Sequence, residues 1–194
     1  HVDVHARLAR AGQGRIQRGA QPGVGRKVER RETVVEDVEL GAPGQRAAIA
    51  AASRVSNPGC YSTGAIALLA PLVRDGLIPA DWPVTINAVS GYTGGGKAMI
   101  AEFEDAAGET YVETPYRLYA MGLSHKHVPE IQDRTGLKHR PLFSPAVGRY
   151  AKGMLVNIPL PLWALPGGPA LADLQGSLAG AYAGEAFVEV ASLE

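Results

Sequence analysis

Cysteine is nearly absent from this sequence, because Cys60 is the single one among its 194 residues. A single cysteine excludes an internal disulfide and any zinc site built from several cysteines. A lone thiol fits a reducing compartment. The sequence also lacks an apolar run long enough for a transmembrane helix. The basic start, residues 1–18, has no apolar stretch of the kind found in a secretory signal.

An excess of charge of either sign is absent as well, since 19 Lys and Arg balance 19 Asp and Glu. The chain therefore has no net basic field to attract nucleic acid or a membrane surface, and neither partner is expected. Its 46% apolar and 20% charged residues are ordinary for a globular protein, and the length suffices for one good-sized core or two small ones.

Apolar periodicity is missing from residues 1–40, which are dense in glycine and arginine. We predict that this atypical segment is irregular or disordered. It could also come from a mis-started or frameshifted reading frame. Its glycines do not form G-x-G-x-x-G, and no apolar strand leads into them, so a dinucleotide fingerprint is not indicated. Residues 41–194 are expected to form one domain.

Helical and strand patterns alternate irregularly from Pro43 onward. Helices are predicted over 45–54, 60–76, 98–106, 127–136 and 171–184, with Pro71 as an irregularity inside the second. Strands are predicted over 83–92, 115–124, 141–150, 152–163 and 186–191. Because strict β-α-β alternation is absent, we predict an α+β domain with a mixed, largely antiparallel sheet and helices packed on it.

Cys60 follows an Asn-Pro-Gly turn and begins the second predicted helix. Backbone N–H groups at a helix start carry partial positive charge, which favours thiolate over thiol. A thiolate held there can attack an electrophilic carbonyl. The alternative is a small buried side chain that only packs.

His125 and His127 precede a predicted helix, and either imidazole could act as a general acid or base for a thiol mechanism. The alternative is a pair of solvated loop residues. A metal site is not predicted, because the two histidines have no clear third ligand beyond Glu130.

The turn GYTGGGKA, Gly91 to Ala98, imitates a phosphate-binding loop. Ala98 stands where the motif needs Ser or Thr to hold magnesium, which argues against a P-loop NTPase. A glycine-rich turn between strand and helix still exposes N–H groups, and Lys97 adds a charge. The turn could therefore cradle an anion such as an acyl phosphate, or be a flexible surface turn.

Four segments, in this order, resemble the N-acetyl-γ-glutamyl-phosphate reductases: SNPGCYSTGAIALL, INAVSGYTGGGK, HKHVPEI and SPAVGRYAKGMLV. The resemblance covers roughly residues 41–194 and is to the shorter-chain branch of that family, within the wider semialdehyde-dehydrogenase group. It implies the catalytic and dimerisation domain of that group, a cytoplasmic enzyme, and a homo-oligomer formed through this domain.

The resemblance also implies an activity: NADPH-dependent reduction of N-acetyl-γ-glutamyl phosphate to the semialdehyde, with phosphate release, in arginine biosynthesis. Cys60 is then the nucleophile that forms a thioester, and His127, with His125 second, is the acid/base residue. Glu130 is expected to orient the substrate or the histidine. The residues implied in substrate binding are Asn57, Ser90, Gly91, Lys97 and Glu130. Gly94 and Gly95 are expected on the nicotinamide side of NADP.

The sequence departs from the family in three respects. The family's N-terminal Rossmann domain, which binds NADP, and its C-terminal return segment are both missing here. Arg149 stands where the family more often has asparagine, and could bind a carboxylate or lie in solvent. We therefore expect the chain alone to be inactive, and a non-catalytic fragment without nucleotide binding is an alternative. Others are a related aspartyl- or aminoadipyl-phosphate reductase and a cysteine hydrolase.

Overall fold

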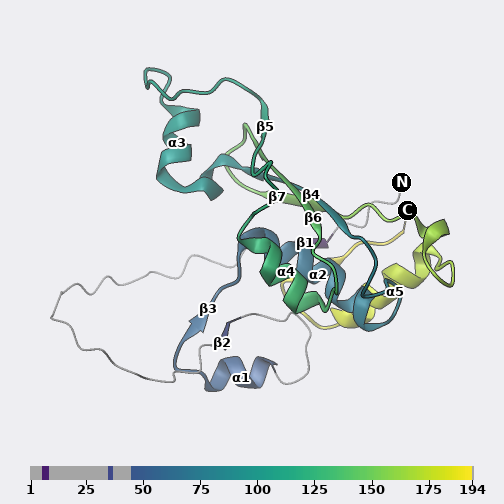
Figure 1. Cartoon of the computed structure of the whole chain (residues 1–194). Coiled ribbons are helices and arrows are strands. Elements are labelled where there is room, and N and C mark those ends of the chain that lie inside the picture. The colour runs from purple at the N-terminus through teal and green to yellow at the C-terminus, as the bar shows by residue number, and fades with distance from the viewer. Residues whose placement is uncertain (1–5, 9–34, 37–44, 194) are drawn as a thin grey trace.

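The computed structural model describes residues 6–8, 35–36 and 45–193, and Figure 1 shows their arrangement. Apart from two short strands, the segment predicted to be irregular lies outside these ranges. β1 (Ala6–Leu8) pairs antiparallel with β8 (Val188–Val190). β2 (Val35–Glu36) pairs in parallel with β3 (Val55–Ser56). For the rest of residues 1–40 the expectation stays a prediction.

A four-stranded sheet lies at the centre of the fold, in the order β5-β6-β4-β7. Its strands are β5 (Tyr116–Leu118), β6 (Leu142–Gly148), β4 (Thr85–Gly91) and β7 (Met154–Asn157). β4 and β6 run parallel, whereas β5 pairs with β6 and β7 pairs with β4 in the antiparallel sense. The predicted α+β class with a mixed sheet is therefore confirmed.

The two central strands bury one face of the sheet. On β4, which lies in the strand predicted over 83–92, Ile86 and Ala88 are buried and Asn87 between them is exposed, as is typical of a half-buried strand. Ile86 pairs with Phe143 of β6, so both side chains lie on this face. A Cβ atom built on Gly64 of α2 (Cys60–Arg74) would lie 2.9 Å from Cγ2 of Val156 of β7, so α2 packs closely there too.

α2 carries its core contacts on a stripe with helical spacing, formed by Tyr61, Ala65, Leu68, Leu69 and Leu72. The helix ends where the sequence predicted, because Gly76 follows with a φ of +74°, a conformation that favours glycine.

Pro71 lies inside α2 and has no N–H to give to the carbonyl of Ala67, one turn earlier. The hydroxyl of Tyr182, which follows α5 (Leu171–Ala181), donates to that carbonyl at 2.6 Å. Burial raises the pKa of Tyr182 to about 12, so the hydroxyl keeps its proton. The proline is therefore accommodated by a hydrogen bond from another element.

α4 (His127–Thr135) packs against α2 beneath the sheet, as Figure 1 shows, and buries Val128 and Ile131. It ends at Gly136, whose φ is +73°, as predicted. α3 (Gly96–Glu104) follows the short turn η1 (Tyr92–Gly95) and stands apart from α2, α4 and α5 (Figure 1). The other helical segments are α1 (Gln45–Ala51) and η2 (Leu162–Ala164). Of the helices described, none combines the length and apolarity needed to cross a bilayer.

The strand predicted over 115–124 is wrong in its extent, because β5 ends at Leu118. Ala120 and Leu123 have φ values of +51° and +54°, which are incompatible with an extended strand. The chain turns there instead, and the turn brings Tyr119 and His125 within ring contact of each other, at 5.9 Å between centroids. Left-handed non-glycine residues are strained and often occur near functional sites.

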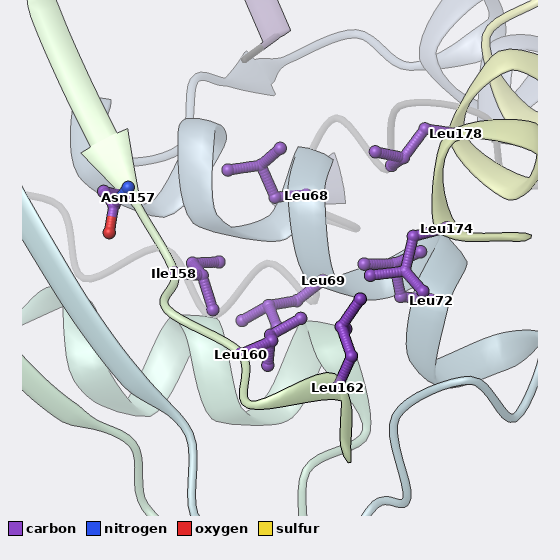
Figure 2. Close-up of a pocket in the computed structure, with 9 residues that line it drawn as sticks. All are labelled: Leu68, Leu69, Leu72, Asn157, Ile158, Leu160, Leu162, Leu174 and Leu178. Carbon is purple, nitrogen blue, oxygen red and sulfur yellow. The ribbon is translucent and has the colours of Figure 1, made fainter. Parts of the chain in front are cut away.

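An apolar cavity lies between α2, α5 and the segment after β7 (Figure 2). Its lining is Leu68, Leu69, Leu72, Asn157, Ile158, Leu160, Leu162, Leu174 and Leu178. The lining contains no titratable or nucleophilic side chain, and its part of α2 lies about two turns beyond Cys60. The cavity therefore contributes no group to the chemistry at the cysteine.

Candidate active site

Cys60 is the first residue of α2, and its side chain is exposed. The alternative in which this cysteine packs as a small core residue is therefore excluded. The first intrahelical bond runs from the N–H of Thr63 to the carbonyl of Gly59, at 2.9 Å. The N–H groups of the residues between them lie ahead of the helical bonding pattern, so the thiol stands at the positive end of α2.

Gly59, the N-cap residue of α2, lies directly against His127. A Cβ atom built on Gly59 would overlap the imidazole, with Nε2 the nearest atom. No other residue type fits here unless the ring moves. The close approach of ring and backbone therefore places the Nε2 edge of His127 one residue away from Cys60.

His125 and His127 form an edge-to-face pair in which the ring centroids are 4.5 Å apart and the planes 65° apart. The backbone N–H of His127 donates to Nδ1 of His125 at 3.2 Å. Because Nδ1 accepts this bond, neutral His125 carries its proton on Nε2, and protonating Nδ1 would break the bond. His125 is thus held in one neutral form.

His127 is buried, with only 6% of its surface exposed, and its Nδ1 has no hydrogen-bond partner among the described residues. A buried N–H without an acceptor is rarer than a buried acceptor without a donor. The proton of neutral His127 therefore belongs on Nε2, the atom that faces Gly59 and Cys60. In this form His127 can donate a hydrogen bond at the cysteine.

Burial lowers the pKa of both imidazoles. For His125 the charge of Lys126 lowers the pKa further. For His127 burial is again the main cause, His125 adds to it, and Glu130 acts in the opposite direction. Both rings are therefore expected to be neutral near pH 7.

Two tyrosines that the sequence analysis did not single out join this cluster. The hydroxyl oxygen of Tyr61 lies 2.9 Å from Ser90 Oγ and 2.9 Å from the carbonyl oxygen of Ala146. Burial, the hydrogen bond to Tyr61 and the charges of Tyr61 and Cys60 all raise the pKa of Tyr119. Tyr119 thus remains a protonated hydroxyl close to the cysteine. Tyr61 begins the apolar stripe of α2, so extending that stripe by one turn could have found it.

The glycine turn after β4 satisfies its first N–H groups within the chain. The N–H groups of Gly91 and Tyr92 donate to the carbonyls of Gly153 and Tyr150, at 2.9 and 3.0 Å. Gly91 has no room for a side chain, because a Cβ atom there would be 2.6 Å from the carbonyl oxygen of Tyr150. An anion at this turn would have to use the exposed start of α3 and Lys97 instead.

The structure brings some predicted site residues together and leaves others outside the cluster. The cluster around Cys60 contains His125, His127, Glu130 and Ser90. Gly94 is adjacent, since a Cβ atom on it would be 3.7 Å from Ser90 Oγ.

Asn57, Lys97 and Gly95 are exposed and lie outside the hydrogen bonds of this cluster in the described part of the chain. Arg149 is exposed, and its guanidinium already has partners within the chain. Its guanidinium donates to Tyr111 Oη at 2.6 Å and to the carbonyl of Val112. Within the described ranges, no three His, Cys, Asp or Glu side chains are grouped in a way that could hold a metal ion.

Comparisons with known proteins point to one group. The sequence profile described as semialdehyde dehydrogenase, dimerisation domain, matches residues 60–194. The N-acetyl-gamma-glutamyl-phosphate reductase of Brucella anthropi is 55% identical over 153 residues, which are 79% of this chain and 49% of that protein. The protein of the same name from Brucella ovis is 54% identical over the same shares of both chains. The chain thus spans about half the length of these relatives.

Replacing Gly59 by alanine is expected to push the His127 ring away from Cys60. We expect alkylation of Cys60 by iodoacetamide to slow by about tenfold or more, since misplacement by an ångström can cost that much. Gly176→Ala in α5 is the control, because a Cβ atom there meets no atom within 4 Å. Equal alkylation rates in the two variants would contradict the close approach.

The stability of the protein is expected to fall as the pH decreases from about 7.5 to about 5.5, a range above the titration of carboxyl groups. Because the pKa values of His125 and His127 are lowered in the folded chain, the unfolded chain binds more protons in this range. The free energy of unfolding therefore falls as the pH decreases. Urea denaturation at each pH measures this. Replacing both histidines by glutamine should flatten the dependence, and an unchanged slope would show that these two rings are not responsible.

Proposed function

Because this chain belongs to the semialdehyde dehydrogenase, dimerisation domain family, we propose that it carries the reacting cysteine of an acyl-phosphate reductase. The observation that supports this best is the exposed thiol of Cys60 at the start of α2, with the Nε2 edge of His127 beside it. The names of the relatives point to N-acetyl-γ-glutamyl phosphate as the substrate.

The first chemical step is acyl transfer to the cysteine. The thiolate of Cys60 attacks the carbonyl carbon of the acyl phosphate and the S–C bond forms. The bond between that carbon and the oxygen that bridges to phosphorus then breaks. Inorganic phosphate leaves with the electron pair of that bond. The N–H groups at the start of α2 and Nε2–H of His127 are placed to stabilise the negative charge on the carbonyl oxygen, and Tyr119 supplies a further hydroxyl nearby.

NADPH, when bound, would supply a hydride to the carbonyl carbon of the thioester. The C–S bond then breaks, which releases the aldehyde and regenerates Cys60 as a thiolate with no net proton transfer. In this step, as in the first, Nε2–H of His127 stabilises the negative charge on the former carbonyl oxygen. His125 holds His127 in place by accepting a hydrogen bond from its backbone N–H. The histidines act here mainly as fixed hydrogen-bond donors.

The described residues fit only one end of NADP. Ser90, which is bonded to Tyr61, and Gly94 beside it lie at the cluster around Cys60, and we propose that the nicotinamide end lies there. The glycine-rich turn between the parallel strand β4 and α3 lacks the G-x-G-x-x-G spacing of a loop that holds a pyrophosphate. We propose that most of the nucleotide is held by groups outside the stretch that this chain shares with its relatives.

The open face of the central sheet is proposed as the surface that joins two copies of the chain. Leu142 pairs with Thr85 and Leu155 with Val89, so these leucines share the face opposite α2. Leu118 of β5 lies on it as well, opposite Ala146. The three leucines are between 44% and 48% exposed, which is unusual for an apolar group of this size.

Acylation can be tested without the nucleotide. Incubating the chain with N-acetyl-γ-glutamyl phosphate should add the acyl mass to the Cys60 peptide and release phosphate, whereas Cys60→Ser should do neither. Aspartyl phosphate and a carrier-bound aminoadipyl phosphate, offered in parallel, test the related substrates. In the reverse direction, NADPH formation from the semialdehyde should require phosphate in a full-length protein that includes the nucleotide-binding groups. Acylation at another residue, or unchanged turnover in Cys60→Ser, would reject the assignment.

Association through the sheet is tested by placing a charge on it. Sedimentation should show a dimer for the parent chain and a monomer for Leu155→Lys, because a lysine in an apolar contact loses its hydration. Trp163→Lys is the control, since Trp163 is 89% exposed on η2 and off this face. The proposed interface would be contradicted if the parent chain were a monomer, or if Leu155→Lys remained a dimer.

A further inference from the structure

The start of α2 is capped by a side chain from another helix. Its N-cap residue, Gly59, offers no side chain. The N–H of Gly59 donates instead to the carboxylate of Glu130 on α4, at 3.3 Å to Oε1 and 3.4 Å to Oε2. The hydroxyl of Ser62, which is fully buried in the first turn of α2, donates to Oε2 as well. Both carboxylate oxygens thus have partners within the chain.

The reason for this arrangement is the contact between Gly59 and His127. Helices usually begin with Ser, Thr, Asp or Asn, whose own side chain accepts a hydrogen bond from the first turn. At position 59 such a side chain would occupy the space of the imidazole. Position 59 therefore cannot supply a side-chain cap. Its own N–H is bound instead by the residue three positions after His127, on the same side of α4.

Two residues in one turn of α4, His127 and Glu130, therefore contact Gly59. The ring of His127 lies against its Cα, and the carboxylate of Glu130 binds its N–H. Since Cys60 is the next residue, these contacts together determine where its sulfur lies relative to Nε2 of His127. A carboxylate is also stabilised at the positive end of a helix, which favours this position for Glu130.

We propose that Glu130 is a positioning residue, which fixes the start of α2 against His127 and does not bind the substrate. An acyl phosphate is an anion, so a carboxylate is a poor direct ligand for it. The inference rests on the proposed function only in naming Cys60 and His127 as the reacting pair. It replaces the expectation that Glu130 contacts the substrate.

Two variants of equal charge separate positioning from electrostatics. Glu130→Gln keeps a carbonyl oxygen that can accept from Gly59, whereas Glu130→Ala keeps no acceptor, and both lose the negative charge. The readout is the rate of Cys60 alkylation by iodoacetamide, a neutral probe that needs no substrate site. We expect Glu130→Ala to react about tenfold more slowly than Glu130→Gln. Equal rates in the two variants would overturn the proposal.

A substrate-binding role has a different signature. If Glu130 bound the acyl phosphate, Glu130→Ala would raise the half-saturating substrate concentration for acylation and leave iodoacetamide alkylation unchanged, which would overturn the proposal. Positioning predicts the reverse: an unchanged half-saturating concentration and a lower maximal rate. Because alkylation does not involve substrate, it judges Glu130 even if the parent chain proves not to be acylated at all.

Loss of folding does not remove the test. Should circular dichroism show that Glu130→Ala is not native, Glu130→Asp is compared with the parent chain, since it keeps the charge and shortens the reach by one methylene. Positioning predicts severalfold slower alkylation in Glu130→Asp, and an unchanged rate in this variant would contradict it.

Discussion

The contact between the backbone of Gly59 and the ring of His127 is the constraint on which the site depends. It joins the start of α2 to the start of α4, two elements that are distant in the sequence and adjacent in the fold. It excludes a conventional cap on α2, where the carboxylate of Glu130 binds the N–H of Gly59. It also places a neutral imidazole, rather than a charged one, beside the exposed thiol of Cys60.

Much of this frame could be predicted from the sequence, because local rules determine it. Cys60 begins a helix since Asn-Pro-Gly ends the preceding element, and Gly76 and Gly136 end α2 and α4 in the conformation that favours glycine. The alternation of β4 also followed from its pattern of side chains. In each case the residues that decide the structure are neighbours in the chain.

The partners of the site residues could not be predicted in the same way. Glu130 binds Gly59, 71 positions away in the sequence, and no local pattern encodes that pair. Tyr119 reaches the cluster only because Ala120 and Leu123 adopt left-handed backbone where an extended strand was expected. The glycine turn after β4 was expected to offer its N–H groups to an anion, yet Gly91 uses its own to bind a distant carbonyl. Long-range packing decides all three.

The central claim is that folding makes the sulfur of Cys60 more reactive. The most direct measurement compares its rate of alkylation by iodoacetamide at pH 7 in the folded chain and in the same chain unfolded in urea. If the start of α2 and Nε2–H of His127 stabilise the thiolate, the folded chain should react at least about tenfold faster. An equal or slower reaction in the folded chain would show that the fold does not activate this cysteine.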